Sequence, residues 1–417
     1  MNTTTFTLTP DQESALAAIH SFLLNPVEEV FVLSGYSGCG KSTLIRTLLD
    51  SLPNFIKATK LIQPKLEHFP VQLTATTNKA AENLAQITGT EATTIHSFLG
   101  LRVSTNYKTN ITTLVASKKS VAENQLVFID EASYIDSELL RHIFNKLKNC
   151  KIIFVGDPAQ LIGIKAAGAP VFESKFTGAA LTTVVRQANT NPIVDLATLF
   201  RHTVNTGHWP QFAPDGHHIQ YLQRDDFREK ILTEFNRSGW IYQDSKVLTW
   251  TNKCAIDFNN FIRTTATGDP KFAVNDYAVC NSFLSVGNQS IKTDQMVHIT
   301  GISHSGIRHG VAGSLITMDH TVSAFMPNSL AERNARVKEA RANNELGVVQ
   351  DITEKWVDLR AAYAQTINKS QGSTYGSVFI DLDDVSRCNS GDSIARMLYV
   401  GVSRAKHHVF LTGDLVH

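Results

Sequence analysis

Short apolar runs alternate with amphipathic segments through the first part of the chain. The strand-like runs lie at 29–34, 71–75, 125–130 and 151–155. The helix-like segments that precede or separate them lie at about 10–24, 41–51, 78–88 and 136–148. This alternation is typical of a parallel sheet covered by helices on both faces. It predicts a first α/β domain over residues 1–180.

The same alternation returns towards the C-terminus. Strand-like runs at 245–250, 377–382 and 407–412 lie among helical segments. They predict a second α/β domain, built from residues 181–275 and 361–417. Residues 276–360 interrupt it with short strand-like pieces, glycine-bearing turns and a polar helical stretch at 329–346. We interpret 276–360 as an insertion, and the mixed charges of its helical stretch as a solvated face.

A shorter interruption lies within the first domain. Residues 102–119 are rich in Thr, Val, Ile and Tyr, which favour strands, and Asn106 and Asn110 flank a turn position near the middle. This segment predicts a β-hairpin inserted into the first domain.

Composition narrows the class of protein. The 417 residues are 42% hydrophobic and 18% charged, which indicates a folded chain of two or three domains. The five cysteines are far apart and show no metal-ligand spacing, so we expect neither a zinc site nor a disulfide scaffold, and a reducing cytoplasm as the location. No apolar run approaches the roughly 20 residues of a membrane span, and no secretory signal is visible. The net charge of +1 does not indicate nucleic-acid binding, but a local basic groove remains compatible with it.

Residues 35–42, GYSGCGKS, match the phosphate-binding pattern G-x-x-x-x-G-K-[ST]. The alternative is a chance glycine-rich turn, but a buried strand precedes the segment and a helix follows it, as this loop requires. Lys41 is expected to reach the β- and γ-phosphates, and Ser42 to ligate Mg²⁺. The residues predicted to hold the nucleotide are Gly38, Cys39, Gly40, Lys41, Ser42 and Thr43.

Two further strands end in polar residues that suit nucleotide hydrolysis. The apolar run LVFIDE ends in Asp130, predicted to hold Mg²⁺ through water, and Glu131, predicted to act as general base on the attacking water. The next strand ends in VGDPAQL, where Gln160 is a candidate sensor of the γ-phosphate. The alternatives are an ordinary strand end for the carboxylates and a polar turn residue for Gln160.

Gln12, in LTPDQ, has two interpretations. Thr9 can cap a helix that begins at Pro10, with Gln12 as its capping-box partner. Alternatively, the Gln12 amide reads the adenine edge with one donor and one acceptor. The residues alone favour the cap, and one amide cannot fill both roles at once.

Taken in order, these motifs and several others resemble those of superfamily 1 DNA helicases of the 5′-to-3′, RecD-like branch. KSQGST and VGVSRAK are specific to such helicases, whereas the phosphate loop alone is not. The likeness spans nearly the whole chain. The matching segments are 8–12, 35–43, 74–84, 94–100, 127–133, 155–161, 184–187, 247–253, 366–382 and 398–411.

The resemblance implies two RecA-like domains with ATP and Mg²⁺ between them. It shifts the interpretation of Gln12 towards adenine contact. It also implies that Arg404 and Arg186 reach the γ-phosphate, where a planar cation stabilises developing charge. Gly372 resembles a residue of the segment that links the nucleotide to the DNA.

The resemblance further implies two walls of a single-strand track. On the first domain, neutral donors suit phosphate oxygens and Phe98 suits base stacking, although His96 and Phe98 also fit ordinary helix packing. On the second, Trp250 is equally compatible with a core position. The hairpin at 102–119 resembles the pin that splits the duplex, and 276–360 resembles a small β-barrel with an extension over the strand. The implied track residues are Thr76, Asn78, Thr94, His96, Ser97, Phe98, Trp250, Thr251, Asn252, Lys369, Ser370 and Gln371.

The sequence therefore predicts an ATP-dependent DNA helicase that moves 5′ to 3′ on single-stranded DNA and unwinds duplex. The alternatives are a translocase that displaces bound proteins and a nucleotide-controlled DNA-binding or loader protein. A small-molecule kinase would leave KSQGST and VGVSRAK unexplained. The expected partners are single strands, duplex junctions and a single-strand-binding or replication protein, without a membrane. The likeness also suggests a phage origin, and hence the host cytoplasm.

Overall fold

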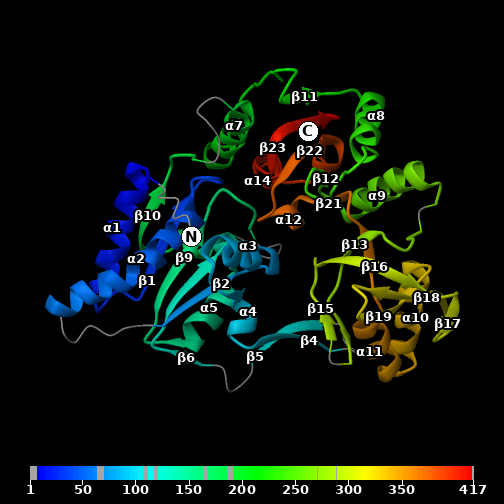
Figure 1. Cartoon of the computed structure of the whole chain (residues 1–417), viewed down its shortest axis with the longest axis horizontal. Coiled ribbons are helices and arrows are strands. Elements are labelled where there is room, and N and C mark those ends of the chain that lie inside the picture. Colours follow the sequence, from blue (N-terminus) through cyan, green and yellow to red (C-terminus); the bar gives the residue numbers. More distant parts are fainter. Residues whose placement is uncertain are drawn as a thin grey trace.

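The protein is described here from a computed structural model. The described residues are 7–62, 70–106, 111–116, 121–162, 168–185, 191–269, 271–287 and 289–415. They form two α/β units side by side, with a smaller β-rich unit beside the second (Figure 1). Arg186, the predicted second arginine of the cleft, lies outside the described residues.

The first unit is a six-stranded sheet in which every neighbouring pair is parallel. Alternate residues along a strand face opposite sides, so Phe128 and Ile153 pack against α1 and α2 while Val127 and Ile152 pack against α5. In sheet order the strands are β10 (Thr177–Leu181), β1 (Val30–Gly35), β9 (Lys151–Gly156), β7 (Leu126–Asp130), β2 (Val71–Ala75) and β3 (Ala92–Thr94). The helices are α1 (Pro10–Leu24), α2 (Lys41–Ile62), α3 (Asn78–Thr88), α4 (Ile95–Phe98), α5 (Ser137–Lys146) and α6 (Pro170–Glu173).

Helix α2 is longer than the sequence predicts. The expected end near residue 51 precedes Pro53, which removes a backbone donor from a helix interior. The helix nevertheless continues to Ile62, because residues on both sides of Pro53 bury apolar surface. Leu52 is buried in the core, and Phe55 stacks on His20 of α1 with ring centroids 4.2 Å apart.

The second unit is a five-stranded sheet, again with only parallel pairs. Helices α7 and α14 cover one face and α8 and α9 the other. The strands, in sheet order, are β11 (Ile219–Tyr221), β23 (Ala405–Thr412), β22 (Tyr375–Asp381), β12 (Ser245–Thr249) and β21 (Ala364–Thr366). The helices are α7 (Pro192–Thr206), α8 (Arg224–Phe235), α9 (Asn252–Thr267), α12 (Ile367–Ser370), α13 (Leu382–Val385) and α14 (Gly391–Ser403). The two parallel sheets confirm the predicted α/β class.

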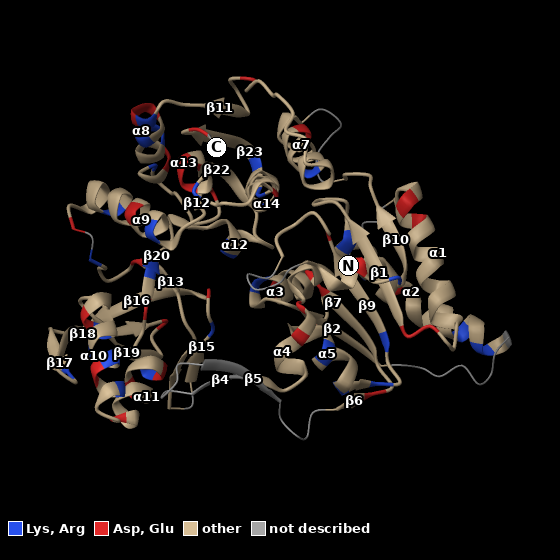
Figure 2. Ribbon diagram, turned by 180° about the vertical axis from the view of Figure 1, so that it is seen from behind, with Lys and Arg blue, Asp and Glu red and all other residues tan. Residues whose placement is uncertain are grey.

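Between β12 and β22 the chain forms an antiparallel sheet. Its strands are β13 (Tyr277–Cys280), β16 (Met296–Ile302), β17 (Gly306–Arg308), β18 (Val311–Met318), β19 (Val322–Pro327) and β20 (Leu359–Ala361), beside the two-stranded β14 (Leu284–Val286) and β15 (Gln289–Ile291). The polar stretch predicted as one helix at 329–346 is wrong in its length. It forms α10 (Leu330–Ala342), which ends before Asn344 takes a φ of 60°, and a separate α11 (Leu346–Lys355) follows. Charges of both signs lie on these helices (Figure 2).

In the first unit, β4 (Leu101–Asn106) and β5 (Ile111–Ala116) pair antiparallel, with Leu101 opposite Ala116 and Asn106 opposite Ile111. This ribbon extends from the first unit towards β15 (Figure 1). The remaining short elements are β6 (Ala122–Glu123), β8 (Leu147–Lys148) and the 3₁₀ turn Ala132–Tyr134. Within the described ranges, none of the helices has the length and apolar character needed to cross a membrane.

Candidate functional site

The glycine-rich loop joins the carboxyl end of β1 to the first turn of α2. Gly38 and Gly40 have φ values of 81° and 82°, in the left-handed region that favours glycine. A Cβ on Gly40 would also lie 2.5 Å from Gln12 Nε2. Lys41 folds back along the loop, and its Nζ donates to the carbonyl oxygens of Gly35 at 2.8 Å and Tyr36 at 2.9 Å.

Gln12 is buried beside this loop with both ends of its amide engaged. Thr9 N donates to Gln12 Oε1 at 3.0 Å and Gln12 N donates to Thr9 Oγ1, which completes the predicted capping box. Gln12 Nε2 donates to the carbonyl oxygen of Cys39 at 2.9 Å. Adenine contact would therefore use the second Nε2 hydrogen or displace one of these bonds.

Two carboxylates stand at the end of β7, at the same sheet edge as the loop. Glu131 has a φ of 54°, and its backbone N–H donates to Asp130 Oδ1 at 2.8 Å. Burial, and then the neighbouring Glu131 charge, raises the pKa of Asp130 to about 7, against an opposing effect from Lys41. Thr76, at the end of β2, donates through its hydroxyl to the carbonyl oxygen of Glu131 at 3.1 Å.

Gln371, from the second unit, contacts one of these two carboxylates, Glu131. Its Nε2 donates to Glu131 Oε2 at 2.8 Å and to Gln160 Oε1 at 2.7 Å. Its Oε1 is buried and accepts no hydrogen bond from the described residues. Gln371 was expected on the single-strand track, but the residue is only 4% exposed and its side chain contacts the predicted hydrolytic residues Glu131 and Gln160.

Arg404 also crosses between the units. It follows the last residue of α14 and is buried, with Nη2 donating to Ser37 Oγ at 3.2 Å and Nη1 to the carbonyl oxygen of Ser373 at 3.3 Å. Gly372, with a φ of 79°, accepts a hydrogen bond from the Asn83 side chain of α3. The second unit therefore contacts the phosphate loop and the helix α3 of the first.

These residues line one cleft between the α/β units. Its volume is about 1210 Å³, including the part open to solvent. Among the described residues there is no group of three or more His, Cys, Asp and Glu side chains suited to a metal ion. A Mg²⁺ ion held by Ser42 and Asp130 would therefore take most of its oxygen ligands from water and nucleotide, as Mg²⁺ commonly does. The lining includes Gln12, Gly38, Gly40, Lys41, Ser42, Thr43, Asp130, Glu131, Gln160, Gly372 and Arg404.

The first wall of the predicted track lies around β3 and α4. Thr94 caps α4, and its hydroxyl accepts from Ser97 N at 3.2 Å and donates to Ser97 Oγ at 2.9 Å. Phe98 is half-buried against the core of the first unit. The pKa of His96 is lowered by burial, opposed by Asp136 and aided by His142. Asn78, half-buried, is the first residue of α3.

The second wall lies at the end of β12. Thr251 caps α9, and Asn252 is exposed on its first turn. The Trp250 ring is partly buried against the core of the second unit. Asp384 accepts from the backbone N–H groups of Trp250 at 2.7 Å and Thr251 at 2.9 Å, and from Thr251 Oγ1 at 2.6 Å.

The predicted track residues on α12 and at its C-cap, Gln371, have different surroundings. Lys369 Nζ donates to Asn281 Oδ1 at 2.7 Å and pairs with Asp294 Oδ1 at 2.8 Å, both in the antiparallel unit. Ser370 is fully buried, and its hydroxyl donates to the carbonyl oxygen of Ile367. Because Gln371 is buried against Glu131 and Gln160, only Lys369 of these three residues is partly exposed.

Sequence reasoning missed several residues that organise the site. Asp384 shows only as the last acidic residue of DLDD after a strand. Asp157 and Tyr399 lie inside matched motifs, VGDPAQL and LYVGVSRAK, but nothing in their spacing indicates that they meet. Tyr399 donates to Asp157 Oδ2 across the two units.

Two family models match the chain. The model of the AAA domain matches residues 7–213, and the model of the UvrD-like helicase C-terminal domain matches residues 361–412. The chain is 24% identical over 451 residues to the ATP-dependent DNA helicase dda of Enterobacteria phage T4, covering 97% of this chain and 98% of that protein. It is 28% identical over 391 residues to the ATP-dependent RecD2 DNA helicase of Deinococcus radiodurans, covering 92% of this chain and 47% of that protein.

The fold is also similar to solved structures of Pif1 helicases. A structure of DNA unwinding at forked duplex by two coordinating Pif1 helicases superposes with a TM-score of 0.54 at 16% identity, covering 99% of this chain and 93% of the other. Bacteroides Pif1 in complex with ADP-AlF3 and single-stranded DNA gives a TM-score of 0.53 at 15% identity, covering 99% and 94%. The two parallel sheets are therefore RecA-like.

Proposed function

Because this chain belongs to the superfamily 1 DNA helicases, we propose that it couples ATP hydrolysis to 5′-to-3′ movement along single-stranded DNA and to duplex unwinding. The direction follows the RecD-like branch that the motifs resemble. Relatives that match over most of this chain include an ATP-dependent DNA helicase of a phage and one of a bacterium. The curated phage relative is matched over 98% of its own length, so the comparison concerns the whole enzyme.

The observation that carries the proposal is the meeting of both α/β units around one cleft. The phosphate loop, Asp130 and Glu131 come from the first unit, while Gln371 and Arg404 come from the second. Hydrolytic residues divided between two units act together only when the units are close. ATP binding and hydrolysis can therefore drive a relative motion of the units, which a motor requires.

Each cleft residue has a chemical role that suits its position. When ATP binds, Lys41 Nζ would donate to phosphate oxygens in place of the carbonyl oxygens of Gly35 and Tyr36. Glu131 would take a proton from the attacking water. Gln160 and Gln371 would orient that water, since the unpartnered Gln371 Oε1 offers it an acceptor. Arg404 would stabilise charge on the transferring phosphoryl group.

The donor set fits a Mg²⁺ ion. Ser42 and Asp130 line the same cleft, where burial first and the Glu131 charge second raise the pKa of Asp130, and a divalent cation beside Asp130 would favour its ionised form. When bound there, the ion would neutralise charge on the β- and γ-phosphates.

The segment 369–372 connects hydrolysis to the predicted track. Gln371 contacts Glu131 and Gln160, while Lys369, two residues earlier, reaches the antiparallel unit. A DNA strand that shifts this short segment would also shift the Gln371 amide at the general base. This arrangement supports an ATPase that DNA stimulates.

The test compares ATP turnover with and without single-stranded DNA in the parent, Lys41→Ala and Glu131→Gln proteins. We expect the parent rate to rise on adding DNA and both variants to lose turnover. Glu131→Gln keeps the shape but not the base, so it should still bind ATP, measured with a fluorescent nucleotide.

Two results would contradict the proposal. Turnover in the parent that ignores DNA would exclude a DNA-driven motor, and near-parental turnover in Glu131→Gln would exclude Glu131 as the base. Strand displacement from a duplex with a 5′ single-stranded tail, compared with a 3′ tail, tests unwinding and its direction.

A further inference from the structure

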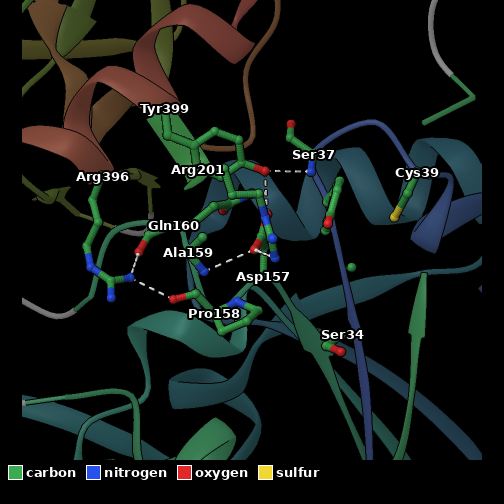
Figure 3. A network of polar contacts seen from close by, with 12 residues as sticks. Ser34, Ser37, Cys39, Asp157, Pro158, Ala159, Gln160, Arg201, Arg396 and Tyr399 are labelled. Atoms are coloured by element: carbon green, nitrogen blue, oxygen red, sulfur yellow. Dashed lines mark hydrogen bonds and ion pairs between the residues drawn. The ribbon is translucent and has the colours of Figure 1, made fainter. Parts of the chain in front are cut away.

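We propose that the Tyr399 hydroxyl is a positioning group for hydrolysis: it ties helix α14, and with it Arg404, to the phosphate loop when the two units close. This inference rests on the proposed function, since it assigns a role within the same cleft. It concerns four residues that meet at the contact between the units, the Tyr399 network: the backbone of Ser37 and the side chains of Asp157, Arg201 and Tyr399 (Figure 3).

The hydroxyl joins three segments of chain. It accepts a hydrogen bond from the backbone N–H of Ser37 in the phosphate loop at 2.9 Å and donates to Asp157 Oδ2 after β9. Burial, and then the Asp157 charge, raises the pKa of Tyr399 well above its usual value, so the hydroxyl keeps the proton that it donates. The ring lies in the core of the second unit, so the hydroxyl has little freedom to move.

Asp157 is fully buried and accepts from further donors. Arg201 Nη2, on α7 of the second unit, lies 3.1 Å from Asp157 Oδ1, and Ala159 N donates to the same oxygen at 3.0 Å. The Arg201 guanidinium also stacks over the Tyr36 ring at 3.8 Å. A buried carboxylate needs such partners, and two of its three donors belong to the other unit.

Helix α14 therefore touches both phosphate-facing segments of the first unit. Tyr399 holds Ser37 by its backbone, and Arg404, just past the end of α14, donates to the Ser37 hydroxyl. Earlier on the same helix, Arg396 Nη1 donates to the carbonyl oxygens of Pro158 at 2.6 Å and Gln160 at 2.8 Å (Figure 3). Helix α14 therefore fixes the position of Arg404 relative to the turn that carries Gln160.

The network can form only while the units are together. If the hydroxyl is missing, closure leaves the Ser37 N–H and one Asp157 oxygen without this partner in a water-poor contact. The closed arrangement, in which Arg404 acts, is then disfavoured. Ground-state ATP binding depends mainly on the phosphate loop of the first unit, so we expect it to change less than turnover.

The test is Tyr399→Phe, which removes one oxygen and keeps the ring. We expect kcat with saturating single-stranded DNA to fall by about tenfold, with KM for ATP changing by less than about threefold. The matched control is Tyr363→Phe, a half-buried tyrosine of the same unit whose hydroxyl pairs with Arg263, away from the cleft. It should keep the parental kcat.

A mutant cycle with Arg404→Ala separates positioning from a general loss of stability. If Tyr399 acts through Arg404, removing the hydroxyl from the Arg404→Ala protein should lower single-turnover hydrolysis by less than about twofold. A full tenfold further loss in that background would overturn the inference, as would a parental kcat in Tyr399→Phe.

The outcomes also separate this inference from the proposed function. A parent whose turnover ignores DNA rejects the function, whereas a DNA-stimulated parent with an equally active Tyr399→Phe rejects only the role of Tyr399. If Tyr399→Phe does not fold, judged by its melting temperature, Asp157→Asn replaces it in the cycle, because the amide leaves one oxygen instead of two to accept from Tyr399, Arg201 and Ala159.

Discussion

At the scale of single residues, Arg404 has contacts that fit a group acting in the closed cleft. Arg404 is buried, and its partners are two neutral hydroxyls, of Ser37 across the cleft and of Ser403 beside it, and two carbonyl oxygens rather than a carboxylate. Charge that is not neutralised by a carboxylate remains available to a phosphoryl group. Arg404 is therefore not an arginine of an ordinary surface ion pair, because it is buried and contacts Ser37 of the phosphate loop.

Arg404→Ala should lower kcat by roughly 10³-fold or more with little change in affinity for single-stranded DNA, because the side chain serves the transition state. Steady-state ATPase and DNA binding by fluorescence anisotropy measure the two effects. Arg237→Ala is the control, since Arg237 makes exposed ion pairs with Glu234 and Asp244. If DNA binding is lost while hydrolysis survives, Arg404 belongs to the DNA track instead.

At the scale of elements, the β4–β5 ribbon stands apart from the parallel sheet that carries the cleft residues. Among the described strands, β4 and β5 pair only with each other, and β4 begins three residues after α4 ends. The sheet strands that lead to the phosphate loop and to Glu131 do not depend on that pairing. This separation supports the proposed role of 102–119 as a strand-separating pin distinct from the motor.

Replacing 103–117 with a short Gly/Ser turn should keep DNA-stimulated ATPase and movement on single strands while duplex unwinding falls sharply. Nothing would then hold the separated bases apart at the junction. Strand displacement and ATPase are measured on the same preparation, after its melting temperature shows that it is folded. Unwinding at the parental rate would rule out the pin, and loss of ATPase would show that the segment supports the first unit.

At the scale of the whole molecule, the net charge of +1 means that DNA binding depends on local groups rather than on a general positive field. The predicted track combines neutral donors such as Thr94 and Asn252 with few cations. Lys369 is already paired with Asp294, so a DNA phosphate must compete for it.

Single-strand affinity should fall as salt rises, with a slope of log K against log salt of about −0.7 for each phosphate contact, because each contact releases counterions. Anisotropy titrations on mixed, pyrimidine-rich and purine-rich strands should give similar slopes and affinities. Salt-insensitive binding, or a strong preference for one base sequence, would contradict a track built on phosphate contacts.

The two parallel α/β units, the phosphate loop and the carboxylates at the end of β7 could be predicted from the amino-acid pattern alone. These features are local: a glycine-rich turn between a buried strand and a helix, or an acidic pair at a strand end, needs only neighbouring residues to form. The order of the helicase motifs along the chain indicated the protein family. Pattern alone failed where packing outweighed it, as in the continuation of α2 through Pro53 and the break between α10 and α11.

The amino-acid pattern does not reveal which distant side chains meet, and the packing of the two units settles this. Gln371 lies at Glu131 instead of on the track, Ser370 is buried, and Tyr399 bridges Ser37 and Asp157. A motif shows that a residue is near a site but not which way its side chain points. That direction depends on how two sheets, joined through a long stretch of chain, turn their helices towards each other, and no periodicity along the sequence records it.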